Sequence, residues 1–122
     1  MATRLKFEKF PGYTNVQVES FVKMKIGTDL NWAKHAAVKI FSLQTKNERR
    51  IHASVTKDNY GFSKYDAPYY SVLACKLRKK SKLTPGQERK LFKLDRYARQ
   101  LISVCDRTKM QKALDKYYGE YL

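Results

Sequence analysis

The residues best suited to chemistry in this chain are basic and lie close together in its C-terminal half. Between residues 76 and 93 the sequence has eight basic residues and one acidic residue, Glu88. Like charges at this density repel one another, so the segment favours an anionic partner that neutralises them. The predicted contact residues are Lys76, Arg78, Lys79, Lys80, Lys82, Arg89, Lys93, Arg96 and Arg99, together with Phe92.

Helical spacing places part of this cluster on one face of a helix predicted over residues 85–105. Arg89, Lys93, Arg96 and Gln100 recur at intervals of four, three and four residues. Phe92 projects from the same basic side, where an aromatic ring can stack on an unpaired base. The alternative is a solvated face on which a neighbouring helix covers Phe92. The apolar stripe on the opposite side consists of Leu91, Leu94, Ala98, Leu101, Ile102 and Cys105.

A second predicted helix begins near Asp66, so residues 66–101 form a helix–loop–helix arrangement. This arrangement is comparable with a DNA-binding helix-turn-helix, which needs a short turn and a helix with base-reading side chains. The loop predicted here is longer and rich in Lys. Contacts with phosphates are therefore favoured over reading of a duplex sequence.

The whole chain is strongly basic, with 26 Lys and Arg, 11 Asp and Glu, and a formal net charge of +15. This balance fits a nucleic acid, an anionic membrane surface or an acidic protein surface. No stretch is apolar for long enough to cross a membrane, so we expect no membrane-embedded part. Residues 1–10 lack the apolar core of a signal peptide, and we expect a cytoplasmic protein with reduced Cys75 and Cys105.

Catalytic constellations are not evident. His35 and His52 have no cysteine or carboxylate nearby in sequence that would suggest a metal site. Asp29, Asp66 and Asp106 each precede a predicted helix and are interpreted as caps. We therefore expect a protein that is not an enzyme and that has no metal and no cofactor.

The N-terminal part of the chain predicts strands and one helix. Pro11-Gly12 has turn composition, and residues 4–26 around it are predicted to form a β-hairpin. Apolar and polar residues alternate over residues 16–26, which is the period-two pattern of a half-buried strand. An amphipathic helix of about fifteen residues should follow, capped by Thr28 or Asp29, and should cover the hairpin.

The remaining elements complete a prediction of α+β class. Residues 51–65 predict a short second hairpin, and residues 66–122 predict three helices. Thr84 and Gln87 have the spacing of a capping box for the middle helix. The 122 residues, 43% of them hydrophobic, suit one domain, strand-rich over 1–65 and helical over 66–122.

Residues 60–65 resemble half of the first ribonucleoprotein signature of RNA-recognition motifs, whose strand aromatics stack on bases. The matching residues are Tyr60, Gly61, Phe62 and Tyr65. The departures are Asp58, Asn59 and Ser63, and the three closing helices do not follow that fold's order of strands and helices. We assign no family, and the resemblance implies at most an exposed aromatic hairpin as a stacking surface.

The function expected from these patterns is binding of nucleic acid, or of a nucleoprotein complex, through the basic helical face. RNA or a single strand is favoured over a duplex because aromatic residues are interleaved with the basic ones. The alternative, from a different class, is a small virus-encoded inhibitor or adaptor that docks its basic surface on an acidic groove. Salt-sensitive binding to bare nucleic acid separates the first from the second.

Overall fold

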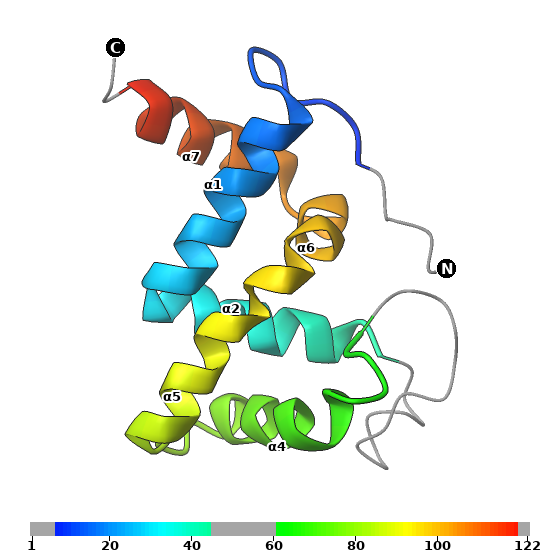
Figure 1. Cartoon of the computed structure of the whole chain (residues 1–122), viewed down its shortest axis with the longest axis vertical. Helices are drawn as coiled ribbons and strands as arrows, with labels where there is room; N and C mark the ends of the chain where they lie inside the picture. Colours follow the sequence, from blue (N-terminus) through cyan, green and yellow to red (C-terminus); the bar gives the residue numbers. More distant parts are fainter. Residues whose placement is uncertain (1–6, 45–60, 120–122) are drawn as a thin grey trace.

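The computed structural model describes residues 7–44 and 61–119, and every regular element in these two ranges is helical. The order along the chain is α1 (Asn15–Thr28), α2 (Leu30–Ser42), α4 (Ala67–Arg78), α5 (Pro85–Leu91), η1 (Phe92–Tyr97), α6 (Ala98–Val104) and α7 (Arg107–Gly119). No strand occurs in these ranges, so the predicted α+β class, with its two β-hairpins, is wrong for the described residues (Figure 1).

Helix α1 replaces the predicted N-terminal hairpin. The turn at Pro11-Gly12 is present, with Gly12 at a φ of 87°, but the chain then enters a helix. Thr14 and Gln17 form a reciprocal capping box. The Gln17 backbone N–H donates to Thr14 Oγ1 at 3.1 Å, and the Thr14 backbone N–H donates to Gln17 Oε1 at 2.8 Å. This capping pair signals the start of a helix, whereas the alternation of apolar and polar residues predicted a strand.

The side chains that α1 buries explain why the alternation was misleading. They are Val18, Glu19, Phe21, Val22 and Ile26. Val18, Val22 and Ile26 recur every four residues, a spacing that fits one face of a strand and one face of a helix equally well. Phe21 and Val22 are adjacent and both buried, which a strand with one solvated face does not allow. Packing of α1 against η1 therefore requires the helix.

The predicted amphipathic helix is confirmed as α2. Asp29 caps it, since its Oδ1 accepts a hydrogen bond from the Asn31 backbone N–H at 3.0 Å. The buried side chains of α2 are Ala33, Ala36, Ala37, Ile40 and Phe41. This apolar face packs against α1 and α4, not against a hairpin.

The predicted second hairpin lies partly outside the described residues, because it begins at residue 51 and the description resumes at Gly61. Residues 61–65 form bends and turns without a strand. Phe62 is fully buried, and its ring stacks on Tyr70 with 5.6 Å between centroids. A ring in the core cannot stack on a base, so the likeness to the ribonucleoprotein signature fails at Phe62.

The single helix predicted over residues 85–105 is divided into α5, η1 and α6. Segment η1 is a 3-10 helix, which has three residues per turn. Leu91 and Leu94, three residues apart, are both fully buried at its start. The tighter winding also changes the direction of later side chains, and Gln100, predicted on the basic face, is buried. The other two closing helices, α4 and α7, lie where the sequence predicts them.

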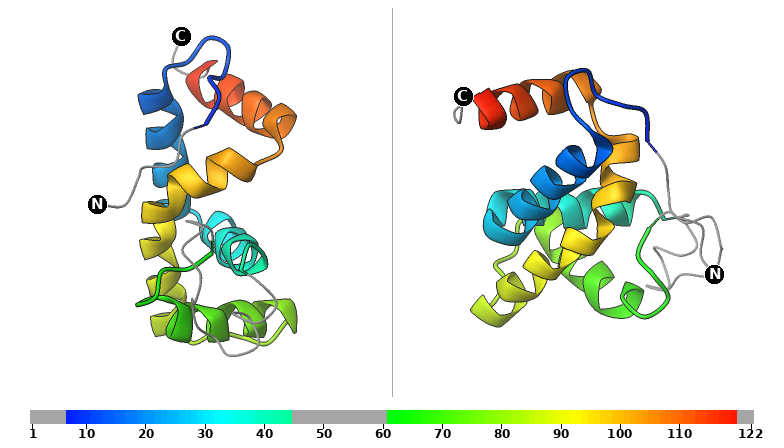
Figure 2. Two further views of the ribbon diagram at one scale, coloured as in Figure 1. Left: turned by 90° about the vertical axis from the view of Figure 1, so that its right-hand side faces the viewer. Right: turned by 45° about the horizontal axis from the view of Figure 1, so that its top comes forward.

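Side-chain hydrogen bonds link helix α4 and the residue before it to α5 and η1. The Tyr70 hydroxyl donates to the Lys90 carbonyl at 2.9 Å, and the Tyr97 hydroxyl donates to Asp66 Oδ2 at 2.6 Å. Helix α7 lies at the end of the molecule opposite α4 (Figure 2). The two views of that figure thus place α4 and α5 at one end and α7 with the start of α1 at the other.

Candidate functional site

The basic cluster lies where α4 ends and α5 begins. The last turn of α4 closes through two backbone hydrogen bonds, from Ser81 N–H to the Lys76 carbonyl at 2.9 Å and from Lys80 N–H to the Leu77 carbonyl at 3.0 Å. This pattern is a Schellman motif. The residue that follows the C-cap of such a helix takes a left-handed conformation and is usually Gly. Here Lys80 occupies that position with a φ of 59°. The fold therefore keeps a strained Lys at a position where Gly costs less.

The start of α5 fixes the other end of the linker, and here the sequence prediction is confirmed. Thr84 and Gln87 form a second capping box, with hydrogen bonds of 3.1 Å to Thr84 Oγ1 and 2.9 Å to Gln87 Oε1. With both ends closed, the linker holds Lys79, Lys80 and Lys82 on an exposed corner of the molecule. We call Lys76, Arg78, Lys79, Lys80, Lys82, Arg89 and Lys93 the corner cluster.

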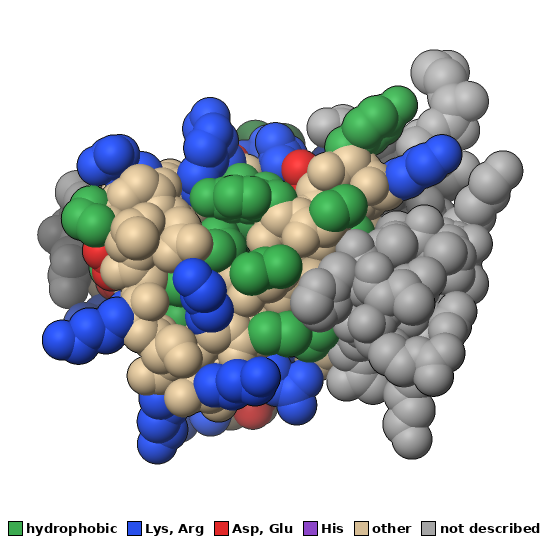
Figure 3. All heavy atoms as spheres, turned by 90° about the horizontal axis from the view of Figure 1, so that it is seen from below, with side chains coloured by type: hydrophobic (Ala, Val, Ile, Leu, Met, Phe, Trp, Pro, Cys, Tyr) green, Lys and Arg blue, Asp and Glu red, His purple; other side chains and the backbone are tan. Residues whose placement is uncertain are grey.

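The charges of the corner cluster have no intramolecular partner among the described carboxylates. The ion pairs in the described ranges involve other basic residues, namely Lys23, Lys25, Lys34, Arg96 and Arg99. Lys76 is half-buried and the other six members are exposed. Figure 3 shows this end of the molecule, where many Lys and Arg side chains surround hydrophobic ones and few acidic side chains appear. The corner is thus a concentrated positive surface.

Arg96 and Arg99, which the sequence also predicts as contact residues, are held in ion pairs. Arg96 Nη2 lies 2.6 Å from Asp66 Oδ2, and Arg99 Nη2 lies 2.9 Å from Glu19 Oε2. Burial acts to lower the pKa of Arg96, but attraction to Asp66 and the hydrogen bond between them raise it above the usual value. Both arginines therefore have a role in holding elements together, and Arg96 still leaves half of its side chain exposed.

Asp66 was predicted to cap α4, and the structure gives its carboxylate another role. Asp66 occupies the N-cap position but accepts no side-chain hydrogen bond from the helix backbone. Its Oδ2 accepts a hydrogen bond from the Tyr97 hydroxyl, which in turn accepts one from the Ser63 backbone N–H at 2.9 Å. Burial and then the hydrogen bond to Asp66 raise the pKa of Tyr97. The network joins the start of α4 to η1.

Phe92 is partly buried and packs against the hydrophobic core. Part of its ring is therefore occupied by core contacts, which leaves less of it free to stack on a base. Among the described residues, the exposed aromatic rings at this end are Tyr65 and Tyr69, which do not belong to the contact residues predicted from the sequence. A helical wheel drawn from residue 65 onward is the signal that finds them, because both fall opposite the buried Ala67 and Ala74.

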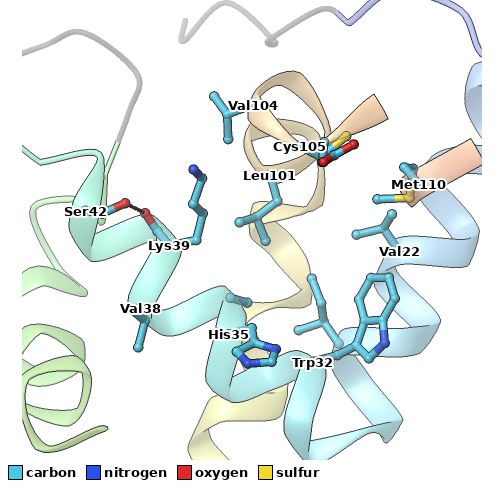
Figure 4. Close-up of a pocket in the computed structure, with 13 residues that line it drawn as sticks. Val22, Trp32, His35, Val38, Lys39, Ser42, Leu101, Val104, Cys105 and Met110 are labelled. Carbon is cyan, nitrogen blue, oxygen red and sulfur yellow. Dashed lines mark hydrogen bonds between the residues drawn. The ribbon is translucent and has the colours of Figure 1, made fainter. Parts of the chain in front are cut away.

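A separate apolar cavity of about 550 Å³ lies between α1, α2, α6 and the start of α7. Figure 4 shows side chains from these four elements around it, with Trp32 and Val22 opposite Val104 and Lys39. Burial raises the pKa of the Cys105 thiol in its wall, which lowers its nucleophilicity at neutral pH. No described hydrogen bond links Cys105 to His35 or Asp106, which also line the cavity.

Two further classes of site are missing from the described ranges. No group of three His, Cys, Asp or Glu side chains there is placed to hold a metal ion. None of the helices over residues 7–44 and 61–119 has the length and apolar content required to cross a membrane.

Comparisons of the chain with protein-family models, with curated protein sequences and with solved structures found no match.

Proposed function

We propose that the protein binds nucleic acid, or a complex that contains it, through the corner cluster. The observation that carries the proposal is the set of seven basic side chains, from the α4–α5 corner along α5 to the start of η1, that no described carboxylate neutralises. Mutual repulsion among these charges destabilises the free protein, and an anionic partner removes that repulsion. Release of counterions from the phosphates also drives the association.

The proposed contacts divide into two kinds. Lys79, Lys80 and Lys82 on the linker reach outward as flexible point charges, which suits phosphates in varied positions. Arg89 and Lys93 extend the same surface along α5 and into η1. All of these proposed contacts are with the phosphate backbone of the nucleic acid, so the proposed binding depends only weakly on the base sequence. RNA or another single strand remains the favoured form, with the cytoplasm as the proposed location.

The experiment measures fluorescence anisotropy of a labelled oligouridine, and of an RNA duplex of equal length, between about 50 and 200 mM salt. Wild-type affinity should fall steeply with salt for both. The variant Lys79→Gln, Lys82→Gln, Lys93→Gln removes three proposed contacts and leaves Lys80 in place. For the single strand, each lost phosphate contact should reduce the slope of log affinity against log salt concentration by roughly 0.7. The slope of the triple variant should therefore be smaller than that of the wild type by about two.

The chain offers a matched control at its other end. Lys109, Lys112 and Lys116 are exposed on α7, and their replacement by Gln changes the net charge by the same amount. Equal losses in the two triple variants would show that net charge alone drives binding and would contradict a site at the corner. If the wild type binds neither RNA at low salt, the nucleic-acid proposal fails, and docking on an acidic protein surface becomes the better explanation.

A further inference from the structure

A strip of exposed apolar side chains runs along the outer side of α4. Tyr65 is 92% exposed, Tyr69 is 44% exposed and Val72 is 40% exposed. Tyr69 and Val72 are three residues apart on one face of α4, and Lys76 continues the line four residues further. Tyr65 precedes the helix by two residues, in the turn that leads into it. Packing of α4 against α2 uses the opposite face, so core formation does not explain why these side chains are apolar.

The ring of Tyr69 is supported on one side by a neighbouring ring. It meets the ring of Tyr70 edge-on, with 5.2 Å between centroids and an interplanar angle of 88°. Tyr70 is itself fixed, because its ring stacks on Phe62 and its hydroxyl donates to the Lys90 carbonyl. An exposed ring supported in this way loses little conformational entropy when a second ring stacks on it.

Positive charge borders the strip on the side of η1. Arg96 reaches across to Asp66, the residue between Tyr65 and the first turn of α4. Lys93 lies one 3-10 turn before Arg96 and therefore projects from the same side of η1. Asp66 is the acid next to the strip, and both Arg96 and the Tyr97 hydroxyl contact its carboxylate. Arg96 thus neutralises the nearby acid, and Lys76 and Lys93 supply the net positive charge near the tyrosines.

Aromatic faces beside cations suit a partner that has exposed rings and regularly spaced phosphates. We propose that Tyr65 and Tyr69 form a stacking platform for unpaired bases of single-stranded nucleic acid, with Lys76, Lys93 and Arg96 beside the phosphates. This inference rests on the proposed function and specifies its substrate class. Membrane insertion fits less well, because one valine and two tyrosines are a small apolar area for the acyl region of a bilayer.

The experiment compares Tyr65→Ala, Tyr69→Ala and the double variant with the wild type, on oligouridine and on the RNA duplex. Each single change should weaken single-strand binding about fivefold or more, which corresponds to at least 1 kcal/mol per stacked base. Duplex binding should stay within about twofold, because paired bases are already stacked. Tyr69→Phe should keep wild-type affinity, whereas Tyr69→Leu, with similar apolar area and no ring, should bind as weakly as Tyr69→Ala.

The controls separate this inference from the proposed function. Val16→Ala removes an exposed apolar side chain on α1, 72% exposed, and should leave both affinities unchanged. If the lysine triple variant loses affinity while the tyrosine variants bind oligouridine as tightly as wild type, the proposed function holds and the stacking platform is refuted. Equal losses on single strand and duplex also refute it, as does tyrosine-dependent binding to phosphatidylserine-containing vesicles without any effect on oligouridine.

Discussion

Gln100 forms hydrogen bonds with both backbone groups of Gly61. The Gly61 N–H donates to Gln100 Oε1 at 2.7 Å, and Gln100 Nε2 donates to the Gly61 carbonyl at 3.2 Å. Both residues are buried, so water cannot replace these bonds. Gly61 has a φ of 88°, and a Cβ there would overlap the side chain of Gln44. The contact therefore fixes the segment before α4 against α6 at a position that accepts only glycine.

Replacement of Gln100 by Leu should destabilise the fold by about 2–4 kcal/mol, because it leaves a buried N–H and a buried carbonyl without partners. Urea denaturation measures the loss. The matched control is Gln111→Leu, since the Gln111 amide also donates to a backbone carbonyl, that of Pro11, but at an exposed site where water can take over. Equal losses in the two variants would contradict a buried clamp at Gly61.

Lys80→Gly should raise stability and weaken nucleic-acid binding at once. The φ of 59° costs a Lys about 1 kcal/mol relative to Gly, so the midpoint of thermal unfolding should rise. The same change removes one charge from the corner cluster and should reduce the salt dependence of RNA affinity. Lys80→Asn, which also tolerates the left-handed region, should show the same loss of affinity with a smaller gain in stability. Unchanged affinity in both variants would remove Lys80 from the proposed interface.

Charge reversal should have different effects on stability at Lys93 and at Arg96, although helical spacing in the sequence predicts both residues on one face. Lys93 is exposed without a described ionic partner, so Lys93→Glu should weaken RNA binding and change the melting temperature little. Arg96→Glu sets a carboxylate against Asp66 and should cost about 1–2 kcal/mol of stability as well. Circular dichroism melts together with RNA titrations measure both effects. Identical melting temperatures in the two variants would show that the Arg96–Asp66 pair contributes nothing to folding.

We expect the ionisation of Tyr97 to lower the free energy of unfolding at alkaline pH. The pKa of Tyr97 in the folded protein is raised, first by burial and then by the hydrogen bond to Asp66. In the unfolded chain the phenol has its ordinary pKa of about 10, so above that pH the unfolded state loses its proton more readily than the folded one. Stability contributed by the neutral phenol is full below pH 10 and declines as the pH rises further.

Tyr97→Phe removes this titration, and its free energy of unfolding should therefore fall less between about pH 9 and 11 than that of the wild type. Denaturation at a series of pH values provides the measurement. Tyr70, whose pKa burial also raises, titrates in both proteins and cancels in the comparison. Parallel pH profiles for wild type and variant would contradict a protonated, partly buried Tyr97.

The sequence alone determined the elements that local signals specify. The capping pair Thr84 and Gln87 located the start of α5, and the pair of candidate caps Thr28 and Asp29 located the start of α2 to within one residue, because a side-chain cap depends only on residues within one turn. The density of Lys and Arg between residues 76 and 93 likewise identified the corner cluster without knowledge of the fold. These inferences survive because they involve no long-range contact.

The tertiary structure decided the rest. Val18, Val22 and Ile26 fit a strand or a helix, and burial of the adjacent Phe21 against the other helices selects the helix. The 3-10 winding of η1 places Gln100 in the core, and no local sequence pattern predicted this winding. Periodicity assigns side chains to faces only when the winding is known. Which face meets water is set by the neighbours that pack against it, and for that reason Phe92 lies partly covered while Tyr65 and Tyr69 lie exposed.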